Sequence, residues 1–296
     1  MRLLITTQVL DAEDPVLGFF HEWVGEFAKH VEHIDVVCLR EGVHALPPNV
    51  AVHSLGKERA KGRLSRSALF IGLSISLKYD AVFVHMNPEY IVLMGWWWRL
   101  TGKKIGLWYT HKSVDLKLRT AELFANIIFT ASKESFRLSS RKVRVAGHGI
   151  DTDFWTPDPS VERRQDWLSV GRLMPSKRHD RAIRLAREKG APLRIAGGGP
   201  EQERLEALAR ELGADVAFLG PCTRETLRDE YRRAARLVHR SETGSLDKVV
   251  LEAAACGCAV DSTDPAISAL PLSPEYVRTH HSLQSLIPRI IQAYDA

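Results

Sequence analysis

Cysteine is scarce in this sequence, and so are long apolar runs. The 296 residues include four cysteines, which form no Cys-x-x-Cys pair and have no histidine at zinc-ligand spacing, so neither a disulfide framework nor a zinc module is expected. The run IVLMGWWWRL is far shorter than the roughly 20 apolar residues that span a bilayer. Its adjacent tryptophans cannot all face one way on a helix, so we expect one or two in the core and one at an interface. No internal repeat or low-complexity segment occurs. These features favour a reducing, cytoplasmic location.

A strong net charge is also absent. The formal charge of +5 does not require a nucleic-acid partner. The stretch MRLLITTQVLDAED turns acidic after one short apolar run, which is too little for a secretory signal, and we expect it to form a first strand. A local basic segment has one acid, Glu58, among five basic residues: Lys57, Arg59, Lys61, Arg63 and Arg66. A solvated loop is the first interpretation of this segment, and peripheral contact with an anionic membrane or a lipid-phosphate acceptor is the alternative.

Short β-branched runs alternate with longer amphipathic segments along the chain. In the first half, strands such as LLITT, AVFVH and KIGLWYT alternate with helices expected near residues 18–30, 64–78 and 88–100. The alternation of strand-like and helix-like segments begins again at DWLSVG, after the charged and proline-containing segment HGIDTDFWTPDPSVERRQ. Such alternation is typical of doubly wound parallel sheets. We therefore predict an α/β protein of two Rossmann-like domains, residues 1–160 and 161–296, with ligands at the carboxyl ends of the strands.

Two stretches of the second half carry the most chemical information. VGRLMPSK, residues 170–177, predicts a strand and then a loop with Arg172 and Lys177, whose guanidinium and ammonium groups suit phosphate oxygens. SETGSLDKVVLEAAACGCAV, residues 241–260, predicts a turn before a helix that starts near Asp247 or Lys248 and aims free N–H groups at an anion. Further along that helix, Glu252 could accept hydrogen bonds from a ribose diol. Together the two stretches predict a nucleotide-sugar site.

The order of these motifs, GRL with a lysine, then AGGGPE, FLG and VVLEAAACG, resembles the donor half of retaining glycosyltransferases of family 4, the glycosyl transferases group 1. The resemblance implies a GT-B architecture, in which an acceptor-side domain (1–160) and a nucleotide-sugar donor domain (161–296) face each other across a cleft. Counting back eight positions from Glu252 reaches Gly244, where the family has a first glutamate. Asp247, or in second place Glu242, is expected to supply the missing carboxylate.

The resemblance also implies roles for residues outside these two motifs. His111, near the carboxyl end of the strand IGLWYTHK, is expected close to the transferred sugar, with the capping of a neighbouring loop as its alternative. Gly18 is expected either to approach the donor phosphate or to be a plain helix N-terminus. Gly198 and Gly199 either allow the backbone to approach the donor or form a tight turn only. The remaining predicted contacts to the donor ribose and sugar are Gly244, Ser245, Leu246 and Lys248.

The activity that the resemblance implies is transfer of a hexose, with retention, from a UDP- or GDP-linked donor to a glycan or lipid-linked acceptor. Arg172, Lys177 and the helix N-terminus would stabilise the leaving diphosphate, so no metal and no other cofactor is expected. His111 and Asp247 are the candidate catalytic residues. Two alternatives stay open: a nucleotide-sugar epimerase of the same fold, and a nucleotide-sugar-binding protein without catalysis, which the absent glutamate at Gly244 favours.

Overall fold

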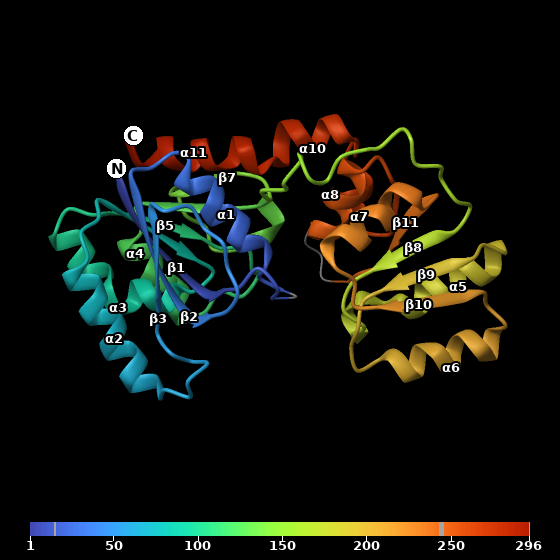
Figure 1. The fold of residues 1–296 in the computed structure, drawn as a ribbon, viewed down its shortest axis with the longest axis horizontal. Coiled ribbons are helices and arrows are strands. Elements are labelled where there is room, and N and C mark those ends of the chain that lie inside the picture. Colours follow the sequence, from blue (N-terminus) through green and yellow to red (C-terminus); the bar gives the residue numbers. More distant parts are fainter. Residues whose placement is uncertain (15, 243–245, 296) are drawn as a thin grey trace. The chain divides into compact units, whose positions relative to one another are not determined.

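The computed structural model describes residues 1–14, 16–242 and 246–295, which fold into two compact units (Figure 1). The first unit consists of Met1–Gly149 together with Leu283–Ala296, and the second consists of Ile150–Ser282. Each unit is built on a parallel sheet with helices on both faces. The predicted fold class, two doubly wound α/β halves, is confirmed.

The strands of the first unit are β1 (Arg2–Leu10), β2 (His33–Glu41), β3 (Val50–Ser54), β4 (Ala81–His85), β5 (Lys104–Trp108), β6 (Ile127–Thr130) and β7 (Val143–Val145). They pair in the order β3-β2-β1-β4-β5-β6-β7, with all neighbours parallel. Leu3 of β1 lies opposite Ile34 of β2 on one side and Ala81 of β4 on the other. A strand paired on both edges and covered on both faces needs a nearly continuous apolar run, which LLI supplies.

The helices of the first unit are α1 (Phe19–Ala28), α2 (Arg63–Ser76), α3 (Pro88–Leu100), α4 (Leu116–Phe124) and α11 (Leu283–Asp295), with a short 3-10 turn, η1 (Lys133–Ser135). Side chains alternate along a strand. Leu3 and Ile5 therefore face the core layer under α1 and α11, whereas Leu4 faces the layer under α2, α3 and α4.

Helix α11 belongs to the first unit although it follows the second unit in the sequence. Ile287 and Ile290 are completely buried in the first unit's core, and the Tyr294 hydroxyl donates a hydrogen bond to the Val82 carbonyl at 2.8 Å. Earlier in the chain, Trp155 packs in the core of the second unit. The boundary between the units therefore lies after residue 149 and not near residue 160 as predicted. The predicted second domain, 161–296, also included residues 283–295, which belong to the first unit.

The strands of the second unit are β8 (Trp167–Val170), β9 (Leu193–Ala196), β10 (Val216–Gly220), β11 (Arg236–His239) and β12 (Ala259–Ser262). They pair in parallel in the order β10-β9-β8-β11-β12. Its helical segments are η2 (Pro175–Lys177), α5 (His179–Lys189), α6 (Gln202–Leu212), α7 (Arg224–Arg233), α8 (Lys248–Ala255), α9 (Pro265–Ser268) and α10 (Pro274–His281). Ile195 of β9 faces the layer under α5 and α6, and Ala196 faces the layer under α7, α8 and α10.

The apolar pattern of the sequence does not predict helix α4 of the first unit. The predicted helix at residues 88–100 is α3, but α4 is not predicted at all. Leu116 and Leu123 of α4 are exposed, and Leu118 and Ala121 are the buried positions, so the apolar residues do not mark one face. A local signal is nevertheless present, because the Asp115 carboxylate accepts a capping hydrogen bond from the Leu118 N–H at 2.8 Å.

The adjacent tryptophans of α3 divide as expected. Trp98 is completely buried, Trp97 is partly buried, and Trp96 is 50% exposed. None of the helices in the described ranges combines the length and the apolar character that a bilayer crossing requires.

Candidate functional site

The carboxyl ends of β8, β11 and β12 lie side by side, because β11 pairs with both of the other strands. Lys177 follows β8, His239 ends β11, and Ser262 ends β12. Asp247 joins them from the position just before α8. We call these four residues the Asp247 cluster. The strand order therefore gathers polar side chains that are far apart in the sequence, at the edge of the sheet where a ligand was predicted.

Asp247 holds this cluster together. Its Oδ2 atom lies 2.6 Å from Lys177 Nζ and 3.1 Å from His239 Nε2, and His239 Nδ1 lies 3.0 Å from Ser262 Oγ. Burial alone would raise the pKa of the Asp247 carboxyl. The hydrogen bond with His239 and the charge of Lys177 outweigh burial and hold that pKa well below its ordinary value. An ionised carboxylate thus already neutralises the ammonium that was predicted to bind a phosphate.

Arg172 lies in the same loop as Lys177, between β8 and η2, and its side chain is exposed. Gly171 at the start of this loop donates its N–H to the Ala196 carbonyl at 3.0 Å. The two cations that were predicted to bind phosphate therefore lie in the same loop after β8 but differ in burial and pairing. Lys177 is paired and mostly buried, with a side chain that is 21% exposed, whereas Arg172 faces solvent.

The loop after β9 packs closely against the loop after β8. The Leu173 N–H donates to the Gly198 carbonyl at 3.0 Å. A β-carbon on Gly197 would lie 2.0 Å from the Gly171 carbonyl oxygen, and one on Gly199 would lie 2.5 Å from the Leu173 carbonyl oxygen. Contact between the two loops therefore accounts for these glycines without a ligand. The role of Gly198 and Gly199 in donor binding stays a prediction.

Glu252, the predicted ribose ligand, lies on the largely buried helix α8. Its Oε2 atom lies 3.5 Å from the hydroxyl of Tyr231, which is completely buried. Burial raises the pKa of the Glu252 carboxyl, and the positive charges of Lys248 and Arg224 oppose the rise. Burial lowers the pKa of the Lys248 ammonium, and Glu252 opposes that change. The glutamate thus has the partners that a buried carboxylate requires.

Arg224 of α7 adds aromatic contacts to this group. Its guanidinium lies 4.3 Å from the ring centroid of Phe154 and 5.6 Å from that of Trp155. Burial lowers the pKa of Arg224, and the carboxylate of Glu252 opposes that effect. The ring contact is of the cation–π type, which favours keeping the guanidinium beside Glu252.

The turn before α8 is described in part. Gly244 and Ser245, both predicted to contact the donor, lie outside the described residues. Leu246 packs against the apolar core of the second unit, a position that favours a structural role for its side chain. Glu242, the second-place candidate for the missing carboxylate, has its Oε1 atom 2.8 Å from Arg178 and 2.7 Å from Arg181.

Two predicted site residues, Gly18 and His111, lie in the first unit. Gly18 is the N-cap residue of α1, and its N–H donates to the Asp14 carbonyl at 2.9 Å. A β-carbon there would lie 2.7 Å from the same oxygen, which accounts for a glycine at this helix N-terminus. His111 is exposed just after β5, and its Nδ1 atom accepts a hydrogen bond from the Ser113 N–H at 3.1 Å. Contact of either residue with a substrate stays a prediction.

His239, Ser262 and Arg224 are site residues that the sequence analysis does not identify. His239 and Ser262 are the last residues of β11 and β12. A polar residue at the carboxyl end of a strand is the signal that points to His111, and the same signal would find these two. In the described ranges no three or more His, Cys, Asp or Glu side chains are grouped as metal ligands would be.

Comparison with known sequences finds a family that resembles most of the second unit. The family model described as Glycosyl transferases group 1 matches residues 153–269, a range that contains the Asp247 cluster and Glu252. D-inositol 3-phosphate glycosyltransferase from Mycobacteroides abscessus is 34% identical over 155 residues, which are 47% of this chain and 34% of the relative. The matched part thus spans about a third of that relative's length.

Comparison with solved structures extends over the whole chain. Anabaena HepE, solved in complex with UDP and glucose, is similar with a TM-score of 0.72 and 15% identity over 100% of both chains. UDP-GlcNAc 2-epimerase from Methanocaldococcus jannaschii has a TM-score of 0.59 and 11% identity, over 100% of this chain and 99% of the other. At these identities the likeness establishes the fold alone. The chain has the GT-B fold, and its residues 153–269 match the family model of the glycosyl transferases group 1.

Proposed function

We propose that this protein is a retaining, metal-independent glycosyltransferase that moves a hexose from a UDP- or GDP-linked donor to a glycan or lipid-linked acceptor. The Asp247 cluster carries the proposal, because it places an ammonium, a carboxylate and an imidazole at the carboxyl edge of a parallel sheet, beside the start of α8. Nucleotides bind at this edge in open α/β sheets. The family match and the name of the Mycobacteroides relative support glycosyl transfer as the reaction.

Arg172, Lys177 and the N-terminus of α8 would bind the donor diphosphate. Negative charge grows on the diphosphate as the glycosidic C–O bond breaks, and fixed positive groups stabilise it. Lys177 already contacts Asp247 at 2.6 Å, so an arriving phosphate oxygen competes with that carboxylate. Donor binding would then free an Asp247 oxygen for a hydroxyl of the donor sugar. Asp247 would thereby replace the glutamate that is absent at Gly244.

The other proposed roles follow from this placement of the donor. Glu252 would accept hydrogen bonds from the ribose hydroxyls. The acceptor hydroxyl would attack the anomeric carbon from the face that the diphosphate leaves and pass its proton to a phosphate oxygen, which retains the configuration. His111 would orient the sugar or the acceptor, and no side chain is assigned as a nucleophile.

Thermal unfolding of the purified protein with UDP, GDP, ADP and CDP, each with and without an attached hexose, tests the donor site. A ligand at about 100 times its Kd adds roughly 2.7 kcal/mol to the stability, so the matching nucleotide should raise the Tm. Arg172→Ala should abolish the shift, and Arg210→Ala, at an exposed arginine on α6, should not. A folded protein whose Tm responds to none of these nucleotides would count against the proposal.

Asp247→Asn tests the proposed exchange at Lys177. The variant lacks the competing charge, so we expect it to bind the bare diphosphate at least as tightly as the wild type. Binding of the diphosphate-hexose should weaken, because the carboxylate for the sugar is gone. An equal loss of affinity for both ligands would instead assign Asp247 the task of positioning Lys177.

A nucleotide-sugar epimerase is the second candidate, on the observed likeness of fold to UDP-GlcNAc 2-epimerase. An epimerase would convert the donor without an acceptor, whereas a transferase leaves it intact or hydrolyses it slowly. His111→Ala should lower the turnover of the transferase more than its donor affinity. NMR of the product would show retention directly, through the anomeric configuration of the new bond.

A further inference from the structure

The outward face of α2 is apolar. Leu64, Ile71 and Ile75 are exposed by 88%, 36% and 55%, and their spacing of seven and four positions places them on one side of the helix. From Ser67 to Leu77 the sequence SALFIGLSISL contains no charged residue. The opposite side of α2 already faces the core through Phe70. A surface helix normally carries charged or polar residues on its outer side, so α2 departs from the usual pattern.

The neighbouring helix α3 repeats this feature. Val92, Trp96 and Leu100 follow one another at intervals of four, and they are exposed by 37%, 50% and 76%. Leu93 extends the same side. The charged residues of α3 are confined to its ends, with Glu89 in the first turn and Arg99 in the last.

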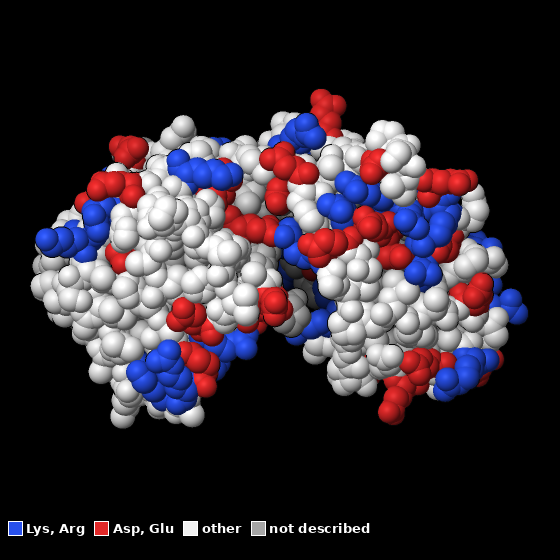
Figure 2. All heavy atoms as spheres, viewed as in Figure 1, with Lys and Arg blue, Asp and Glu red and all other residues white. Residues whose placement is uncertain are grey.

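The two outward faces adjoin. Phe70 of α2 packs against Tyr90 and Trp98 of α3, with ring centroids 4.6 Å and 6.2 Å apart. Figure 2 shows a broad area without charged side chains over these helices, and Lys and Arg side chains gather at its lower edge with Asp and Glu side chains beside them. We define the α2–α3 face by its exposed apolar residues: Leu64, Ile71, Ile75, Val92, Leu93, Trp96 and Leu100.

Positive charge borders the α2–α3 face at the start of α2. The segment that leads into the helix carries the basic residues noted in the sequence: Lys57, Arg59, Lys61, Arg63 and Arg66. All except Arg66 are exposed. Its one acid, Glu58, accepts a hydrogen bond from the Ser54 hydroxyl at 2.7 Å and lies 3.6 Å from Arg59. The segment therefore keeps most of its positive charge towards solvent.

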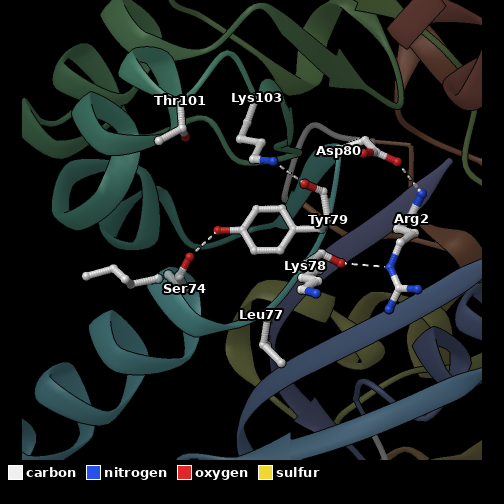
Figure 3. Close-up of a pocket in the computed structure, with 9 residues that line it drawn as sticks. Arg2, Ser74, Leu77, Lys78, Tyr79, Asp80, Thr101 and Lys103 are labelled. Carbon is white, nitrogen blue, oxygen red and sulfur yellow. Dashed lines mark hydrogen bonds between the residues drawn. The ribbon is translucent and has the colours of Figure 1, made fainter.

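Further positive charge lies at the opposite end of α2. A pocket of about 340 Å³ opens where α2 and α3 end, and Ile75 of the α2–α3 face is among its lining residues. Figure 3 shows Lys78, Lys103 and Arg2 around this pocket, with Asp80 as its acid. The Asp80 carboxylate accepts the Arg2 backbone N–H at 2.7 Å. Lys78 is exposed beside the pocket, so cations border the apolar face at both ends.

We propose that the α2–α3 face docks on the surface of an anionic lipid bilayer. Its aliphatic side chains and Trp96 would enter the interfacial region, where tryptophan is favoured. The lysines and arginines at the two ends of α2 would contact lipid phosphates, as basic clusters do on anionic membranes. This charge pattern favours a membrane over a second copy of the chain, because two such faces would bring like charges together. The inference does not depend on the proposed glycosyl transfer.

Co-sedimentation of the full chain with lipid vesicles tests the proposal without an activity assay. We expect binding to vesicles of phosphatidylcholine with phosphatidylglycerol and little binding to phosphatidylcholine alone. The partition coefficient should fall as salt screens the charges. The tryptophan emission of bound protein should shift to the blue, and Trp96→Phe should reduce that shift.

Variants of exposed residues locate the contact. Lys61→Gln and Arg63→Gln should each lower the partition coefficient about fivefold, and Ile75→Ser and Trp96→Ser about tenfold. Matched controls are Val43→Ser, at a valine that is 61% exposed, and Arg210→Gln in the second unit, and both should bind as the wild type does. Circular dichroism and thermal unfolding should be unchanged in all of them.

Three results would overturn the proposal. The first is no binding to anionic vesicles, and the second is equal binding to vesicles of phosphatidylcholine alone. The third is self-association of the wild type in solution that Trp96→Ser abolishes while vesicle binding is absent, which would assign the face to a second copy of the chain.

Discussion

Helix α7 of the second unit exposes a charged surface to solvent, whereas helix α2 of the first unit exposes an apolar one. Most of the ten positions of α7 carry charged side chains, whereas α2 has charges at Arg63 and Arg66 alone among its described residues. Figure 2 shows the same contrast, with dense red and blue over the upper part of the second unit, where α7 lies, and a broad white area over α2 and α3. Both units nevertheless bury the same kind of apolar residues on the two faces of a parallel sheet.

The contrast shows that the fold depends on the buried faces of the sheets and helices and not on their exposed faces. The exposed faces can therefore differ between the units and take part in other functions. In the second unit, charged side chains pair with one another around Glu230, whose carboxylate lies 2.6 Å from Arg164 and 2.8 Å from Arg194. The first unit also has ion pairs, such as Lys117 with Glu89 at 2.7 Å, and its helix α11 packs through buried apolar side chains. The two units should therefore respond differently to mutation and to pH.

The largest effect is expected from Ile290→Ala in α11. Ile290 is completely buried in the first unit, and its truncation should cost about 4 kcal/mol through lost burial and a cavity. Hydrogen exchange should show weaker protection in residues 1–149 and little change in the second unit. The exposed Gln292 of the same helix offers a control, since Gln292→Ala should be neutral. Equal losses of protection in both units would contradict the prediction that Ile290 stabilises the first unit alone.

Acid should weaken the second unit through His179. This side chain is buried with its Nδ1 atom 2.9 Å from Ser169 Oγ, and burial lowers its pKa from 6.5 to about 4. As the pH falls below 6.5, the unfolded chain takes up a proton that the folded unit does not bind until about pH 4. Stability should therefore fall by about 3 kcal/mol between pH 7 and pH 4.

A glutamine at this position tests that assignment. His179→Gln should remove this part of the acid sensitivity in denaturant unfolding, whereas His280→Gln, at an exposed histidine of the same unit, should leave it in place. Identical pH profiles of the wild type and His179→Gln would contradict the prediction.

Glu230→Gln should cost about 2 kcal/mol at neutral pH, because hydrogen bonds to charged groups are lost. Burial would raise the pKa of Glu230, but hydrogen bonds from Arg194 and Arg164 outweigh it and lower that pKa. The stabilisation is therefore present above the unfolded pKa near 4.5 and is lost as the pH falls through the lower folded value. Urea unfolding at pH 7 and at acid pH should show the difference shrink, and Glu211→Gln, at an exposed position of α6, should have little effect.

The smallest effect should be the same in both units. Asp115 caps α4 in the first unit and Thr223 caps α7 in the second, each by accepting an N–H three residues on. Replacement of either by alanine should cost about 1 kcal/mol. A large inequality between the two variants in urea unfolding would show that the units differ in local helix stability as well as at their surfaces.

Much of the fold follows from patterns that are local in the sequence. Apolar runs such as LLI and AVFVH define strands, and the spacing of Leu205, Leu208 and Ala209 defines the buried side of α6. The same reasoning fails for α4, because Leu116 and Leu123 are exposed while Leu118 is buried, and Asp115 is the main signal of the start of this helix. The functional groups of the candidate site also follow directly from the sequence, because residue type alone gives the guanidinium of Arg172, the ammonium of Lys177 and the carboxylate of Glu252.

The sequence alone predicted the two doubly wound halves, and it places Arg172 and Lys177, the predicted phosphate ligands, in one motif after a strand. The tertiary structure alone decided that Lys177 pairs with Asp247 and His239, that α11 returns to the first unit, and that α2 and α3 share an apolar face. The physical reason is distance along the chain. Periodicity and residue type report each segment's own preference, whereas these contacts depend on which strands become neighbours and which helix sides remain uncovered.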